Sequence, residues 1–123
     1  MSNFKKALGN ILESTEGAIG VMLMGTDGIP VEKVILPGTG EDNLDIAATE
    51  MTSLVRNAQR TGHNVGFGSL RELVVCMQNA TFLIRQMSNE YFIVLALDSD
   101  GNIGRGRFEL RKAELDLSRE FAL

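Results

Sequence analysis

The chain has 123 residues, of which 44% are hydrophobic and 23% are charged, and its formal net charge is −4 at pH 7. This composition is typical of a globular protein and excludes a disordered segment, and the length suits one core. We therefore expect a single domain over residues 1–123. The negative charge disfavours general binding to nucleic acid, which requires cations to displace counterions from phosphates.

The sequence also bears on the compartment. The longest uncharged apolar stretch, Tyr91 to Leu97, is far shorter than the ~20 residues of a membrane-spanning helix. No sustained apolar run precedes Glu13, so we expect no export signal. The single cysteine, Cys76, permits no internal disulfide. These features predict a cytoplasmic protein without a membrane span.

The first third of the chain predicts a helix and a hairpin. Apolar residues recur at three- and four-residue steps over residues 4–12, which indicates a short amphipathic helix. Two apolar runs, residues 18–24 and 29–36, are separated by a turn containing Asp27-Gly28, so they should pair as antiparallel strands. Pro30 lacks an N–H and suits the start of an edge strand.

A second helix is predicted to run to about Thr61, with Asp42 or Asn43 as its N-cap and Gly62 as its stop signal. One face of this helix is apolar and should cover the sheet, and it consists of Leu44, Ala47, Ala48, Met51, Leu54, Val55 and Ala58. The opposite face is polar and includes Asp45, Thr49, Ser53, Arg56 and Arg60.

The remaining sequence predicts a three-stranded meander over residues 70–77, 82–87 and 91–97, followed by a closing helix over residues 102–121. In the last strand, residues of both parities are apolar, so both faces of the sheet should be covered by helices. The predicted fold class is α/β (α+β), with a five-stranded antiparallel sheet and the order α-β-β-α-β-β-β-α.

Little in the sequence indicates catalysis. The only histidine, His63, lies at a predicted helix end, where a capping or surface role is favoured over that of a catalytic base. Cys76 lies in an apolar strand and should be a core residue. Phosphate-binding loops and Cys/His metal-ligand spacing are missing from the sequence. We therefore predict neither catalytic residues nor a cofactor or metal.

One segment does match the spacing of a calcium loop. Asp98, Asp100, Asn102 and Glu109 occupy its first, third, fifth and twelfth positions. Ile103, however, stands where such loops need glycine. We therefore favour a strand-to-helix turn in which Asp100 or Asn102 caps the last helix. A calcium or small-ligand sensor remains an alternative.

Two surfaces are candidates for binding proteins. The polar face of the second helix, with Ile46 at its margin, is either a solvated face or a docking face with arginine anchors. The strand over residues 70–77 follows a helix, so its outer edge is open to another chain. Arg71 and Glu72 on this strand are either guards against pairing or reciprocal ion pairs across a two-fold axis.

The order of these pieces resembles the Roadblock/dynein light chain family, over Phe4 to about Leu117. The resemblance lies in the helix-hairpin start with Gly17-Ala18, in residues 23–31, and in Thr49-Glu50 of the second helix. Residues 90–97, 102–104 and 107–111 are similar to the bacterial members of the gliding-motility GTPase-regulator type.

This resemblance implies a profilin-like sheet with one helix on one face and two on the other. It also implies homodimers joined through the second helix and the third strand, with the interface residues Met51, Leu54, Arg71, Glu72, Leu73 and Val75. A small Ras-like GTPase is the implied partner, bound through Ile46, Thr49, Ser53, Arg56 and Arg60. The expected function is a non-enzymatic regulator or adaptor of that GTPase, as an activating or localising partner. A structural scaffold without effect on GTP turnover is the alternative.

Overall fold

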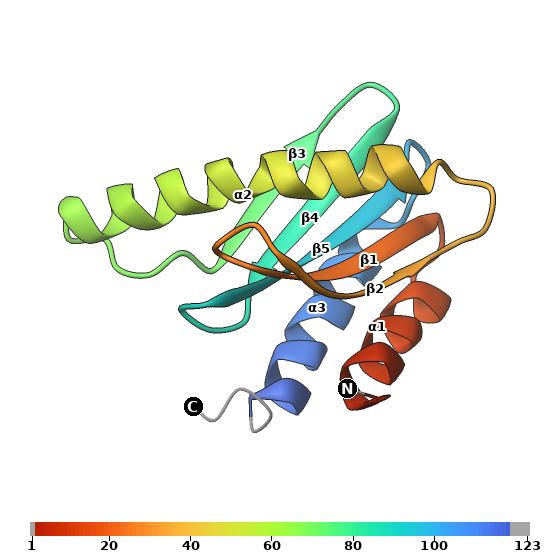
Figure 1. The fold of residues 1–123 in the computed structure, drawn as a ribbon, viewed down its shortest axis with the longest axis horizontal. Helices are drawn as coiled ribbons and strands as arrows, with labels where there is room; N and C mark the ends of the chain where they lie inside the picture. The colour runs from red at the N-terminus through yellow and green to blue at the C-terminus, as the bar shows by residue number, and fades with distance from the viewer. Residues whose placement is uncertain (1, 119–123) are drawn as a thin grey trace.

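In the computed structural model, which describes residues 2–118, a five-stranded antiparallel sheet lies between two layers of helices (Figure 1). The element order is the predicted one: α1 (Ser2–Ser14), β1 (Ala18–Gly25), β2 (Pro30–Ile35), α2 (Glu41–Asn64), β3 (Glu72–Cys76), β4 (Ala80–Gln86), β5 (Tyr91–Asp98) and α3 (Ile103–Leu117). The spatial order of the strands is β2-β1-β5-β4-β3, so β2 and β3 form the two edges.

The sheet separates two apolar cores, as the sequence predicted. On one face, Phe92, Val94 and Ala96 of β5 pack with the buried side of α2. On the other face, Ile93, Leu95 and Leu97 pack with residues of α1 and α3. Figure 1 shows α2 alone on one side of the sheet and α1 with α3 on the other. The implied arrangement of one helix against two is therefore confirmed.

The β1–β2 hairpin forms at the predicted turn. The N–H of Gly28, whose φ is 89°, donates to the carbonyl of Gly25, and the side chain of Asp27 accepts from the N–H of Ile29 at 3.0 Å. A positive φ is readily adopted only by glycine, which explains its place in the turn. Pro30 begins the edge strand β2, as predicted, and the pairing with β1 shifts register between Leu23 and Met24.

The predicted limits of α2 were wrong at both ends. Its N-cap is Gly40, with a left-handed backbone and no side-chain cap, instead of Asp42 or Asn43. At the other end the helix continues through Gly62 to Asn64. A Cβ on Gly62 would lie 2.3 Å from the carbonyl oxygen of Gly68, so glycine is needed there because the following loop folds back onto the helix. The glycine marks a close backbone contact and not a helix end.

The turn before α3 agrees with the prediction of a strand-to-helix cap. The side chain of Asn102 is the N-cap and accepts from the N–H of Arg105 at 2.9 Å. The helix ends at Leu117, and Phe121, which the sequence placed in it, lies outside the described residues. Arg105 also pairs with the buried carboxylate of Glu109 at 2.7 Å. Asn102 and Glu109, two residues of the calcium-like spacing, therefore make their contacts within α3 and its cap.

Candidate dimerisation edge and partner-binding helix

Among residues 2–118, no strand pairs with the outer edge of β3. On its inner side the N–H of Gln86 donates to the carbonyl of Arg71, and at the far end the N–H of Met77 donates to the carbonyl of Ala80. Backbone groups in an antiparallel pair alternate between the neighbour and the outside. Those of Leu73 and Val75 therefore face β4, whereas the groups of residues 72, 74 and 76 face outward and are available to another strand.

After Glu72, the side chains along this edge are uncharged, and some of them are exposed. Val74 is 41% exposed and Met77 is 54% exposed. Cys76 is also exposed, so its prediction as a core residue was wrong. It lies at the last position of an edge strand, where an apolar run in the sequence no longer implies burial. An edge with exposed uncharged side chains favours pairing with a further strand.

Glu72 is engaged within its own chain. Its carboxylate lies 2.6 Å from a guanidinium nitrogen of Arg107 on α3 and 3.8 Å from one of Arg85 on β4. Arg85 also bonds Glu114 of α3 at 2.8 Å. These ion pairs connect the edge strand to α3. Arg85 and Arg107 of the same chain would therefore compete with Arg71 of a second copy for the Glu72 carboxylate.

The other predicted interface residues differ in how accessible they are. Arg71 and Leu54 are exposed. Leu73 and Val75 are half-buried against the core beneath α2. Met51 is buried in that same core, so its packing is explained within one chain. Only some of the six residues thus present substantial surface to a second copy.

The predicted docking face of α2 is exposed along its length. Ile46 is 61% exposed, and Thr49, Ser53, Arg56 and Arg60 are all exposed as well. The Thr49 hydroxyl donates to the carbonyl of Asp45 at 3.0 Å, and Arg60 donates to the side chain of Asn57 at 3.1 Å. The guanidinium group of Arg56 forms no ion pair within the described residues. The face combines an apolar anchor with two available cations.

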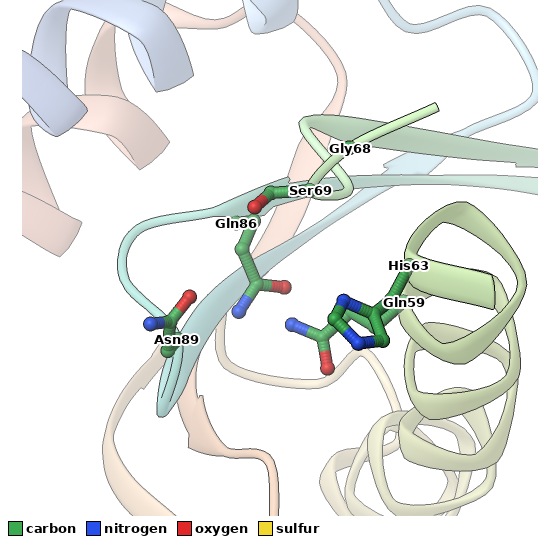
Figure 2. Close-up of a pocket in the computed structure, with 6 residues that line it drawn as sticks. All are labelled: Gln59, His63, Gly68, Ser69, Gln86 and Asn89. Carbon is green, nitrogen blue, oxygen red and sulfur yellow. The ribbon is translucent and has the colours of Figure 1, made fainter. Parts of the chain in front are cut away.

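A polar pocket of about 300 Å³ lies at the C-terminal end of α2 (Figure 2). In Figure 2, Gln59 and His63 of α2 face Gln86 of β4, with Ser69 and Asn89 at its borders. The Gln86 amide donates to the carbonyl of Ser88. His63 is exposed in the last turn of the helix, which confirms the surface part of its prediction. None of the predicted binding residues lines this pocket.

The most exposed large apolar residue in the described chain was not anticipated. Phe67, in the loop between α2 and β3, is 88% exposed. It stands between Gly66 and Gly68, which both have positive φ. The two flanking glycines are the only unusual feature of the sequence around Phe67, and so short a glycine pattern does not predict that a side chain is exposed.

The part of the chain that the structure describes contains neither a candidate metal site nor a candidate membrane-spanning helix. Within residues 2–118, histidine, cysteine and acidic side chains form no group of three placed to hold a metal ion. Over the same residues, every helix is too short or too polar to cross a bilayer.

The family model described as the Roadblock/LC7 domain matches residues 7–97. The chain belongs to the Roadblock/LC7 family. No curated protein matches its sequence.

Solved structures of similar proteins cover nearly the whole fold. MglC from Myxococcus xanthus is 30% identical, with a TM-score of 0.74 and coverage of 98% of this chain and 99% of that one. A structure described as MglB with a tetrameric arrangement is 21% identical, with a TM-score of 0.86 and coverage of 99% and 91%. Gliding protein MglB from Thermus thermophilus is 19% identical, with a TM-score of 0.80 and coverage of 93% and 84%.

Proposed function

We propose that residues 1–123 act as one Roadblock domain that forms a homodimer and, as a dimer, regulates or localises a small Ras-like GTPase in the cytoplasm. The protein acts by binding and performs no chemistry of its own. The single observation that carries the proposal is that a member of this family has both an open β3 edge and an exposed α2 face. MglC, at 30% identity, and the gliding protein MglB, at 19% identity, share this fold.

The dimer is proposed to form by antiparallel pairing of β3 with its own copy. The outward backbone groups of β3 would then gain partners, and the two sheets would become one. Figure 1 shows the C-terminal turns of α2 extending past the strands, so part of this helix lies over no sheet of its own. A second copy beside β3 would supply the missing surface beneath it. Arg71, Glu72, Leu73 and Val75 of the strand, with Met51 and Leu54 of α2, are the proposed interface residues.

The outer face of α2 is the proposed docking site for the GTPase. Ile46 is an exposed apolar anchor, and Arg56 and Arg60 supply cations on the same side of the helix as Thr49 and Ser53. Exposed arginine beside an apolar residue is typical of protein interfaces. Arg56 and Arg60 are assigned to binding and not to the stabilisation of a hydrolytic transition state.

The test is binding to a small Ras-like GTPase from the same organism, loaded in turn with GDP and with a non-hydrolysable GTP analogue. We expect the Arg56→Ala/Arg60→Ala variant to bind at least about tenfold more weakly, since arginine anchors often contribute about 2 kcal/mol or more. The matched control is Arg111→Ala/Lys112→Ala, which removes two exposed cations from α3. Equal binding by wild type and both variants would remove α2 from the docking site.

A scaffold role is the second candidate, because the same edge and helix can recruit proteins without affecting nucleotide turnover. GTP hydrolysis by the bound GTPase separates the two functions. A change in the hydrolysis rate on addition of wild-type protein, absent with the double arginine variant, supports a regulator. Binding with an unchanged rate supports the scaffold.

A further inference from the structure

The loop between α2 and β3 displays Phe67 on a fixed backbone. The N–H groups of Phe67 and Gly68 both donate to the carbonyl of Gly62, at 2.8 and 3.1 Å, and the N–H of Val65 donates to Thr61 at 3.0 Å. The close approach of Gly68 to Gly62 locks the loop against the helix end. Because these bonds already fix the backbone, a partner that covers the 88% exposed ring would have to order only its side-chain torsions.

The surroundings of Phe67 are continuous with the β3 edge. A groove of about 700 Å³ runs from Ala58 and Gly62 of α2, past Phe67, to Arg71 and Glu72 at the start of β3. A strand that pairs with β3 and continues past Glu72 would reach this groove. The outward backbone groups of β3 require a strand as the occupant, and a second copy of this chain offers a strand with the same open edge.

Two-fold symmetry determines which part of the second copy meets the loop. When a strand pairs with its own copy in an antiparallel manner, the start of one strand lies beside the end of the other. The loop that precedes β3 therefore lies beside the turn that follows β3 in the partner. In that turn Met77 is 54% exposed, and its backbone is fixed by the bond to Ala80.

We infer that Phe67 is an anchor of the homodimer and is buried against Met77 of the partner subunit, twice per dimer. The contact joins an aromatic ring to a thioether, a pairing favoured by the polarisable sulfur. The inference rests on the proposed dimer and adds to it a specific contact outside the family-implied interface residues. It also explains why the chain exposes a phenylalanine on a rigid loop.

The first experiment measures the dimer dissociation constant by analytical ultracentrifugation. We expect Phe67→Ala to raise it on the order of tenfold or more, as for an interface hot spot. The matched control is Leu115→Ala, which removes a 77% exposed side chain from α3 and should change the constant less than about twofold. Met77→Ala should weaken the dimer too. The double variant should lose less dimerisation free energy than the sum of the losses in the two single variants.

A second measurement uses fluorescence, because the chain contains no tryptophan. The Phe67→Trp variant carries a single reporter, whose emission should shift to shorter wavelength and whose quenching by acrylamide should fall as dimers form. Phe108→Trp, on α3, should show neither change. The Phe67→Trp variant keeps a large ring at this position and reports on burial independently of any loss of affinity.

The outcomes distinguish this inference from the proposed function. A wild-type chain that stays monomeric overturns both. A wild-type dimer that Phe67→Ala leaves unchanged, with fluorescence of the Phe67→Trp variant independent of concentration, overturns only the anchor. Unchanged dimerisation together with weaker GTPase capture by Phe67→Ala also overturns it, since Phe67 would then belong to the GTPase contact.

Discussion

The two edges of the sheet are built differently. At β2, Pro30 offers no N–H, the register with β1 shifts, and Lys33 binds Glu41 and Asp45 of α2, each at 2.9 Å. At β3 there is no proline, and uncharged side chains such as Val74 are exposed. Proline, irregular pairing and charge all discourage edge-to-edge contact. One edge is thus protected against pairing, and the other is left available for it.

The largest expected effect comes from a proline in the available edge. The N–H of Val74 faces outward, so Val74→Pro removes a bond to a second copy without removing one to β4. We expect the variant to remain folded by circular dichroism and to sediment as a monomer. Val74→Thr, which keeps the N–H and the β-branched shape, is the matched control and should dimerise. A Val74→Pro dimer as tight as wild type would show that β3 is not the pairing edge.

Cys76 provides a probe of the same edge without any substitution. Its thiol is exposed in the single chain, and it lies where β3 ends. We expect its rate of alkylation to fall several-fold as protein concentration rises through the dimer dissociation constant. In the Val74→Pro variant the rate should not depend on concentration. A concentration-independent rate in a wild-type sample shown to be dimeric would place Cys76 outside the contact.

The sequence was sufficient to predict the element order and the two faces of the sheet, because alternation in residues 91–97 and the stripe on α2 follow directly from strand and helix periodicity. Prediction from the sequence failed where the outcome depends on contacts between residues far apart in the chain or on how the elements cover one another. Gly62 looked like a helix end, yet it serves the approach of the 65–68 loop. Cys76 looked buried because an apolar run does not show how far the helices on each face extend over an edge strand. Phe67 was missed because exposure depends on what the fold leaves uncovered.

The ion pairs of Glu72 are expected to contribute a moderate amount to stability. Glu72→Gln leaves Arg107 without this partner and weakens the connection between β3 and α3. Because these side chains are only partly buried, we expect the free energy of unfolding to fall by about 1 kcal/mol. Urea denaturation in the Val74→Pro background measures this without a contribution from self-association. Glu50→Gln, at an exposed position of α2, should leave the midpoint unchanged.

The smallest effect is expected at the protected edge. Hydrogen bonds to Asp45 and then to Glu41 raise the pKa of Lys33 above its ordinary value of 10.5. A raised folded-state pKa means that the stabilisation is fully present below pH 10.5 and is lost as the pH rises through the higher folded value. Lys33→Met should therefore lower Tm slightly at neutral pH, since exposed ion pairs are screened by solvent and salt.

The difference in Tm between wild type and Lys33→Met should shrink in strongly alkaline buffer and in high salt. A difference that persists in both would mean that the side chain stabilises α2 through its aliphatic part and not through its charge. Because Pro30 and the register shift remain, the variant should form no assemblies larger than those of wild type. Larger assemblies would instead identify Lys33 as the main protection of β2, and the contrast between the two edges would then depend on a single charge.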